Sequence, residues 1–410
     1  MEISCTWVLV VLLILYVILG AAIAVLNRFI YIDNSKDYSF SRDGFVNLLM
    51  FLAESSGILI YSFLLCHSKR KTIIQSAFQE NENNSDDDFE EEEKELSNIK
   101  KMGYLGLPAI LDLIASYFGN FAMILMPTTS YIMIKELCLV LITFLISKFI
   151  MKNKHIWDHY IAIFIAIGAL FLVTISLFFG ANANYNQGKG DWCVSLIGIE
   201  FVIVAAIFRS SQFIFEQYCM RKYLFHPFFF IGFEGVIGLL FNIAICIGFY
   251  FIKCNTKDGS IWADICLKDE DGVLRLENIL YTMKLVFKNV IKVVLVISSI
   301  ICLGAYNIFG ICINKYGGAM TRSVIENFKS VLVWFFFWLF WDRNELKEDW
   351  DWIALSGLLL VGIAILIYFG PFKIDEKITI RNRIKAITLR IETENNINAS
   401  GRNSVVPNEY

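Results

Sequence analysis

Ten long apolar stretches divide this chain, and they constrain its fold more than any other feature of the sequence. Each is long enough to cross about 30 Å of hydrocarbon as a helix. Because unpaired backbone groups are too costly in lipid and no alternating barrel pattern occurs, every span must be helical. The expected spans are residues 6–26, 44–65, 102–126, 128–150, 157–179, 192–218, 227–252, 290–314, 318–341 and 350–370. The sequence therefore predicts an all-α, polytopic membrane protein with ten transmembrane helices.

The composition agrees with this fold class. Of the 410 residues, 57% are hydrophobic and 18% are charged, which is too little charge to cover the surface of a soluble domain of this size. The ten cysteines form no CxxC pair, which argues against zinc sites and redox dithiols. No P-loop, GxSxG or HExxH motif occurs. We expect no metal, no cofactor and no nucleic-acid partner.

The first span could instead be a signal peptide that is cleaved after Ala24. However, the segment before it, MEISCT, has no Lys or Arg, and the apolar run is longer than that of a typical signal peptide. We therefore expect a span that is retained.

Basic residues in the short loops predict the orientation of the spans. They gather on one side, for example at 67–71 (HSKRK) and at Arg221-Lys222, and the positive-inside rule makes that side cytosolic, with both termini inside. The chain then divides into residues 1–66 (spans one and two), 67–101 (an acidic cytosolic loop expected to be disordered), 102–180 (spans three to five), 192–370 (spans six to ten, with a non-cytosolic loop at 253–289) and 371–410 (a flexible cytosolic tail). Cys254 and Cys266 share the non-cytosolic loop, where they are either disulfide-bonded or free.

Ionisable residues inside the spans are the main functional signal. Arg322, Glu326 and Lys329 are spaced i, i+4 and i+7, so they share one face of a helix. Each such group costs of order 2.5–3.5 kcal/mol in the middle of a membrane, and groups of this kind usually face a water-filled cavity or a partner. A solute path is therefore one interpretation, and an internally paired structural triad is the other. Further ionisable residues in the spans are Glu54, Asp112, Lys135, Glu136, Glu200, Arg209, Glu216 and Glu234.

We predict a substrate pathway from a subset of these residues. Tyr131 and Lys135 lie one helical turn apart on one face, and Lys135 and Lys329 occupy comparable places in the two halves, which suits an anionic or zwitterionic solute. Glu54 and Asp112 could carry protons because burial favours a neutral carboxyl, or either could pair with Lys135. The predicted pathway residues are Glu54, Asp112, Tyr131, Lys135, Glu234, Arg322, Glu326 and Lys329.

An internal repeat relates the two halves. Residues 128–136 (TTSYIMIKE) resemble 320–327 (MTRSVIEN), and the span after each copy opens with Trp-Asp, at 157–158 and at 350–351. With five spans per half, the second half enters the membrane from the opposite side. Inverted five-helix repeats with a site at their interface are typical of transporters.

Several of these residues also carry a family resemblance. The stretches 51–54 (FLAE), 107–112 (LPAILD), 212–216 (QFIFE) and 226–235, with Tyr306-Asn307 and the block from Thr321 to Lys329, resemble the drug/metabolite transporter superfamily and specifically subgroup F of solute carrier family 35. More distantly, the chain is similar to nucleotide-sugar carriers and to the parasite chloroquine-resistance transporter. The resemblance implies ten helices in inverted repeats, alternating access around a central cavity, and an internal membrane. Lys135 stands where the family pattern has Arg, which keeps the charge but loses the planar fork that binds a phosphate or carboxylate.

The sequence thus predicts a transporter of a small polar or charged metabolite that works by alternating access, as a secondary active carrier or an exchanger. The expected partners are a small-molecule substrate, the lipid bilayer and a candidate coupling proton. A nucleotide-sugar antiporter and a non-transport receptor or scaffold are the alternatives. We do not expect an enzyme, because the four histidines all lie in or beside loops. The expected location is an internal membrane, lysosomal, vacuolar or Golgi.

Overall fold

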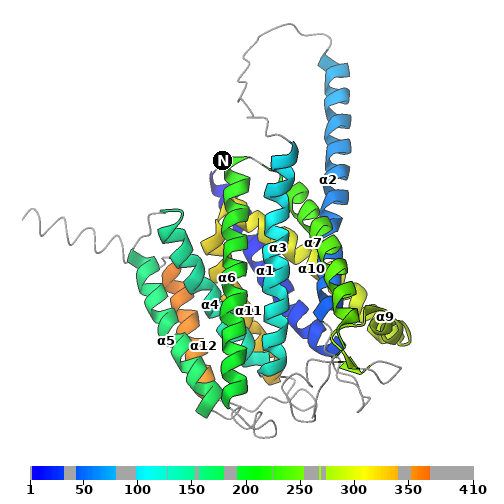
Figure 1. Ribbon diagram of the computed structural model, residues 1–410. Coiled ribbons are helices and arrows are strands. Elements are labelled where there is room, and N and C mark those ends of the chain that lie inside the picture. The colour runs from blue at the N-terminus through cyan, green and yellow to red at the C-terminus, as the bar shows by residue number, and fades with distance from the viewer. Residues whose placement is uncertain are drawn as a thin grey trace, which may run out of the picture.

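A computed structural model describes residues 2–31, 43–79, 98–126, 128–152, 157–179, 192–223, 225–253, 267–268, 274–339 and 352–369. This part of the chain forms a bundle of helices with one short strand pair (Figure 1). The helices are α1 (Glu2–Tyr31), α2 (Asp43–Gln79), α3 (Asn98–Leu125), α4 (Thr128–Phe149), α5 (Trp157–Phe179), α6 (Trp192–Lys222), α7 (Pro227–Phe251), α9 (Ile279–Phe287), α10 (Val290–Tyr316), α11 (Ala319–Leu339) and α12 (Trp352–Tyr368). The strands β1 (Leu267–Lys268) and β2 (Leu274–Arg275) pair antiparallel.

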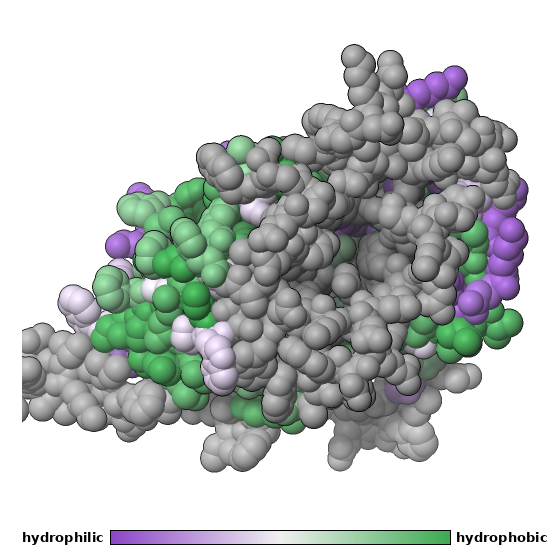
Figure 2. All heavy atoms as spheres, turned by 90° about the horizontal axis from the view of Figure 1, so that it is seen from below, coloured by the Kyte–Doolittle hydropathy of each residue, from purple (hydrophilic) through white to green (hydrophobic). Residues whose placement is uncertain are grey.

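The bundle is that of a polytopic helical membrane protein. Six of the described helices are long and apolar enough to cross a membrane, over Gly44–His67, Gly103–Met123, Trp157–Phe179, Cys193–Lys222, Pro227–Phe251 and Val290–Tyr316. Shorter apolar helical segments occupy Val10–Leu26 and Trp352–Tyr368. Large apolar side chains such as Phe164 (76% exposed) and Phe179 (80% exposed) point outward, and Figure 2 shows such side chains along the visible edge of the bundle. An outward apolar surface of this kind is suited to lipid rather than water.

Helices that are far apart in the sequence lie side by side. The most extensive packing is between α2 and α7, α3 and α6, α5 and α12, and α1 and α10, while α4 packs against both α6 and α11. Figure 1 shows α5 and α12 together at one edge of the bundle. The core consists mainly of Leu, Ile, Val, Ala and Phe side chains from these contacts.

Glycines bring α2 and α7 into unusually close contact. A Cβ added at Gly235 would collide with the backbone of Ser55 and lie 2.7 Å from the Cβ of Glu54, and one added at Gly232 would collide with Ile58. Small residues allow the backbones of two membrane helices to approach in this way. The crossing of α2 and α7 therefore lies at the level of Glu54.

The predicted span boundaries agree with the helices to within a few residues in most cases, and α5 agrees at both ends. Two expectations need correction. Helix α2 continues to Gln79, into the region that we expected to be an acidic loop, and it rises above the bundle in Figure 1. The region 253–289 is not only loop, because it holds β1, β2 and the short helix α9, which is capped by Asn278 accepting from the backbone N–H of Tyr281 at 3.2 Å.

Other expectations lie outside the described residues. These are the acidic run at 80–97, the tail from 370, the Trp-Asp pair at 350–351, and Cys254 and Cys266. The count of ten transmembrane helices also stays a prediction.

Candidate functional site

Three ionisable residues of α11 lie in one buried network, as their shared helical face predicts. Arg322 pairs with Glu216 of α6, with 2.8 Å between Nη1 and Oε2. Lys329 pairs with Glu326 of its own helix at 2.6 Å and with Glu136 of α4 at 3.1 Å. The network therefore joins α4, α6 and α11 inside the bundle.

Two stacked tyrosines complete this network from α1 and α10. The rings of Tyr16 and Tyr306 are 4.3 Å apart between centroids and nearly parallel, at 6°. Both hydroxyls donate to Oε1 of Glu326, from Tyr306 at 2.5 Å. In turn, Arg322 Nε donates to the Tyr16 hydroxyl and Lys329 Nζ donates to the Tyr306 hydroxyl, each at 3.3 Å. Both carboxylate oxygens of Glu326 thus have partners, and polar groups that are satisfied in this way hold one another in place.

The surroundings of Arg322 hold its guanidinium in place. The guanidinium carbon lies 3.8 Å from the ring centroid of Phe213, a cation–π contact. Gly310 leaves space on the α10 side, because a Cβ there would lie 2.8 Å from Nη2. Asn314 of α10 also donates to Glu216 Oε2 at 2.6 Å. The Arg322 side chain is therefore packed between α6 and α10, with its charge matched by Glu216.

A second polar cluster lies between α3, α6 and α7. Arg209 of α6 forms an ion pair with Asp112 of α3, and Ser116 donates to the same carboxylate oxygen at 3.1 Å. Gln212 of α6 donates from one amide nitrogen to Asp112 Oδ2 at 3.1 Å and to Glu234 Oε1 of α7 at 2.8 Å. Asp112 is thus paired with Arg209 and not with Lys135, which was one of the pairings that the sequence left open.

Glu54 of α2 lies between the two clusters. Its Oε1 accepts a hydrogen bond from Asn307 Nδ2 of α10 at 2.7 Å. It also interacts electrostatically with charged groups of both clusters, which are Asp112, Arg209, Glu216 and Arg322. Glu54 therefore lies within electrostatic reach of both clusters, and the two clusters together with Glu54 are the candidate polar site.

Six of the eight predicted pathway residues come together in this site, and two do not. The six are Glu54, Asp112, Glu234, Arg322, Glu326 and Lys329. Lys135 Nζ lies 5.5 Å from the ring centroid of Tyr131, as their spacing predicts, but it forms no ion pair with any residue that the structure describes. Tyr131 is buried with its hydroxyl directed at Gly119 of α3.

Other residues of the site were not among the predicted pathway residues. Arg209, Glu216 and Glu136 were visible as charges within spans, but nothing in the sequence said which partners they have. Gln212, Tyr306 and Asn307 fall in stretches that carry the family resemblance. Tyr16 gave no signal, because it is one aromatic residue in an apolar span.

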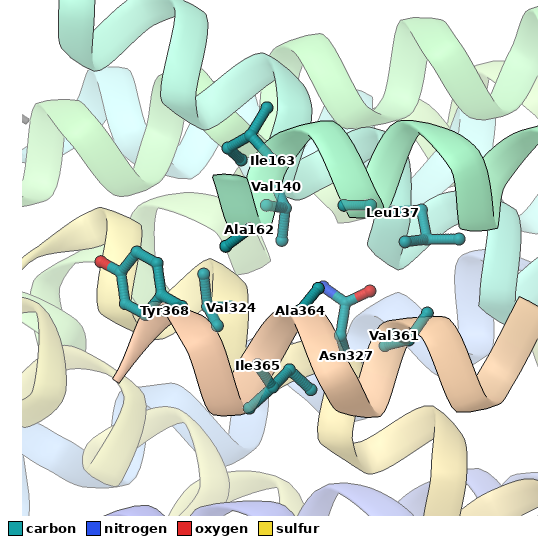
Figure 3. A pocket seen from close by; sticks show the side chains of 11 residues that line it. Leu137, Val140, Ala162, Ile163, Val324, Asn327, Val361, Ala364, Ile365 and Tyr368 are labelled. Atoms are coloured by element: carbon teal, nitrogen blue, oxygen red, sulfur yellow. The ribbon is translucent and has the colours of Figure 1, made fainter. Parts of the chain in front are cut away.

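A separate apolar pocket lies between α4, α5, α11 and α12 (Figure 3). It has about 310 Å³ of empty space, counting space open to its surroundings, and Figure 3 shows Leu137 and Val140 on one side facing Val361 and Ala364 on the other. Its Asn327 amide already donates to the backbone carbonyl of Glu136 at 3.1 Å. The lining offers no charge to a solute, so the polar site and not this pocket is the candidate path for a charged molecule.

Comparisons with known proteins agree with a carrier. Solute carrier family 35 member F6 of Homo sapiens is 21% identical over 333 residues, which cover 81% of this chain and 78% of that protein. The chain is similar to solute carrier family 35 member F6. The Mus musculus form of this carrier is 20% identical over 339 residues, 82% of this chain and 80% of that protein. These likenesses confirm the resemblance to subgroup F that the sequence motifs predict.

Other comparisons add less. An uncharacterized protein of Schizosaccharomyces pombe is 21% identical over 239 residues, which is 58% of this chain and 66% of that relative. No protein-family model matches the chain. A solved structure titled "Crystal structure of protein" has a TM-score of 0.47 at 11% identity, over 88% of this chain and 96% of the other, a likeness too low to support an argument.

Proposed function

We propose that this protein is a transmembrane transporter that moves a small polar or charged metabolite by alternating access, as a secondary active carrier or an exchanger. The buried polar site carries the proposal. It draws ionisable groups from α2, α3, α4, α6, α7 and α11 into the membrane interior, where each is costly and where such groups usually serve a solute or ion path. Similarity to a solute carrier over most of the chain supports the same function.

We also propose ten transmembrane helices in two inverted five-helix repeats, α1 to α5 in the first and α6, α7, α10, α11 and α12 in the second. In such a fold α2 is equivalent to α7, α4 to α11 and α5 to α12, and each of these pairs packs together. The pair α3–α6 would be equivalent to α10–α1, and both pairs also pack. A two-fold relation between the halves explains why these contacts occur together.

The site favours a solute that is not strongly anionic. Each cation of the network already has a carboxylate, in the pairs Arg209–Asp112, Arg322–Glu216 and Lys329–Glu326. A nucleotide sugar carries two negative charges and would have to displace these carboxylates. Zwitterionic and cationic metabolites fit better, which makes the nucleotide-sugar antiporter the weaker alternative. A receptor or scaffold has no use for a charged site that runs through its membrane interior.

We further propose that both termini are cytosolic and that the membrane is an internal one. The basic residues of two neighbouring loops share one side, because Lys315 acts electrostatically on His226, and Arg221 lies beside Gly318. The positive-inside rule assigns this side to the cytosol.

A ligand screen tests the proposal. Purified full-length protein would be melted with a panel of amino acids, amines, nucleosides and nucleotide sugars, because a ligand that binds only the folded state raises the melting temperature. Compounds that raise it would then be tested, radiolabelled, for uptake into proteoliposomes. We expect at least one zwitterionic or cationic compound to stabilise the protein and to enter the vesicles. If no stabilising compound enters vesicles that contain folded protein, the proposal fails.

A further inference from the structure

Among the described residues, the carboxyl groups buried inside the bundle outnumber the cations that pair with them. Away from the helix ends these carboxyls are Glu54, Asp112, Glu136, Glu216, Glu234 and Glu326, each no more than 4% exposed; Asp158 at the start of α5 and Glu277 before α9 are buried as well. The cations that pair with them are Arg209, Arg322 and Lys329. After one carboxylate is assigned to each cation, Glu54, Glu136 and Glu234 remain.

These three carboxyls share a second property. In each of them the oxygen Oε2 is buried and has no hydrogen-bond partner among the residues that the structure describes. An ionised carboxylate has two oxygens that need donors, and burying it without them is far more costly than burying a neutral acid. Glu136 differs from the other two, because its Oε1 lies 3.1 Å from Lys329 Nζ, a cation that favours the ionised form.

Glu54 and Glu234 have only amide partners. Oε1 of Glu54 accepts from Asn307 at 2.7 Å, and Oε1 of Glu234 accepts from Gln212 at 2.8 Å. In a neutral carboxylic acid the carbonyl oxygen accepts a hydrogen bond and the other oxygen carries the proton, so leaving Oε2 without a described partner costs less for the neutral acid than for the carboxylate. Neither residue forms an ion pair within the described part of the chain.

Carboxyls and guanidinium groups surround Glu54, and carboxyls surround Glu234. The groups that act on Glu54 are Asp112 of α3, Arg209 and Glu216 of α6, and Arg322 of α11. The groups that act on Glu234 are Glu216, Glu54 and Asp112. Because Arg209 and Arg322 are each paired with a carboxylate, they leave no unmatched positive charge for a further carboxylate at either position.

Both residues lie at the crossing of α2 and α7, where Gly235 packs directly against the backbone of Glu54 and Ser55. No group of three His, Cys, Asp or Glu that could hold a metal ion occurs among the described residues.

We propose that Glu54 and Glu234 each hold a proton at neutral pH and form the proton-binding pair of this carrier. The proposal rests on the proposed transport function for its role in the cycle. When α2 and α7 separate and admit water, the O–H bond at Oε2 breaks, the proton passes to water, and a carboxylate remains that can take up a proton from the opposite side. One residue of the pair belongs to each half of the proposed repeat.

Infrared spectroscopy of the full-length protein in lipid nanodiscs tests the proposal without a substrate. At neutral pH we expect a carbonyl band of protonated carboxyl groups that shifts in D₂O. The band should lose about half its intensity in Glu54→Gln and in Glu234→Gln, and disappear in the double variant. Asp87→Asn is the control, because Asp87 belongs to the acidic run outside the expected spans, and it should leave the band unchanged.

Absence of the band in the wild-type protein would overturn the proposal. Persistence of the band in the folded double variant would overturn it as well. Should the double variant not fold, the wild-type band and the two single variants decide the question. The outcome is separate from that of the transport proposal. A protein with the band but no transport would refute the transport proposal and leave the protonated pair supported. Transport without the band would refute the protonated pair and leave the transport proposal supported.

Discussion

The α11 network and the α2–α7 crossing bury ionisable groups equally deeply but treat them differently. In the α11 network, Glu326 has donors on both oxygens, and Arg322 and Lys329 each have a carboxylate. At the crossing, one oxygen of Glu54 and one of Glu234 accepts a hydrogen bond from a side-chain amide. The other oxygen of each has no hydrogen-bond partner among the described residues. Equal burial therefore goes with different numbers and kinds of partners in the two regions. Under our proposals the α11 network is a fixed frame, and the crossing is the site that gains and loses a proton.

The largest expected effect is on the frame. Arg322→Met leaves Glu216 buried without its cation and removes a donor to Tyr16, so we expect it to destabilise the protein by about 3–5 kcal/mol. Unfolding of the purified protein in SDS measures this. Arg221→Met removes an exposed arginine at the end of α6 and serves as the control, with an expected change of less than about 1 kcal/mol. Equal losses in the two variants would show that Arg322 is not part of a frame.

The same substitution in both regions sharpens the comparison. Glu216→Gln removes the charge that matches Arg322 and should cost about 3 kcal/mol. Glu54→Gln replaces a neutral acid with a neutral amide that still accepts from Asn307, and it should cost less than about 1 kcal/mol. Thermal melting at pH 7 compares the two variants. If Glu54→Gln is as destabilising as Glu216→Gln, the two regions do not differ as we describe.

Removal of one hydroxyl from the frame should have an intermediate effect. Tyr306→Phe keeps the stacked ring but loses the bond to Glu326 and the bond from Lys329, at an expected cost of about 1.5–3 kcal/mol. Thermal melting measures the loss. Tyr250→Phe, on the partly exposed end of α7, is the control. A wild-type melting temperature in Tyr306→Phe would mean that Glu326 is satisfied without the tyrosine.

The close packing of α2 against α7 can be tested by enlarging Gly235. Gly235→Ala places a methyl group against the backbone of α2 and should cost about 1–3 kcal/mol through overpacking. Gly248→Ala lies on the same helix with nothing within 4 Å of the new methyl group, so it should be neutral or slightly stabilising. The difference in melting temperature between the two variants is the measurement. Two neutral variants would show that α2 and α7 are not in close contact at this level.

The smallest expected effect is on pH dependence outside the membrane. Burial, and after it the charge of Lys315, lowers the pKa of His226 below its usual value. The folded state therefore binds this proton less readily than the unfolded state, so stability is fully present above about pH 6.5 and is lost as the pH falls through the lowered pKa. In His226→Asn the decrease in melting temperature between pH 7.5 and pH 5 should be smaller by a degree or two. An unchanged decrease would remove His226 from this role.

The sequence predicted the parts of the molecule that depend on local periodicity. Hydropathy located the spans, and helical spacing placed Arg322, Glu326 and Lys329 on one face. It did not predict partners that meet only through packing, such as Tyr16 with Tyr306 or Asp112 with Arg209. Lys135 is the instructive case. Its depth in the span suggested a pairing with Glu54 or Asp112, but Asn307 and Arg209 occupy those carboxyls, and depth alone does not determine which helix faces which.

Uptake by Glu54→Gln tests the central claim most directly, because this variant should fold normally but cannot exchange a proton at that position. Wild-type protein, Glu54→Gln and the exposed control Glu200→Gln would be reconstituted in parallel, and uptake of a compound that stabilises the wild-type protein would be measured with a pH gradient across the membrane. We predict uptake by the wild-type protein and by Glu200→Gln, and background uptake by folded Glu54→Gln. Equal uptake by all three would contradict proton exchange at Glu54 as a step of transport.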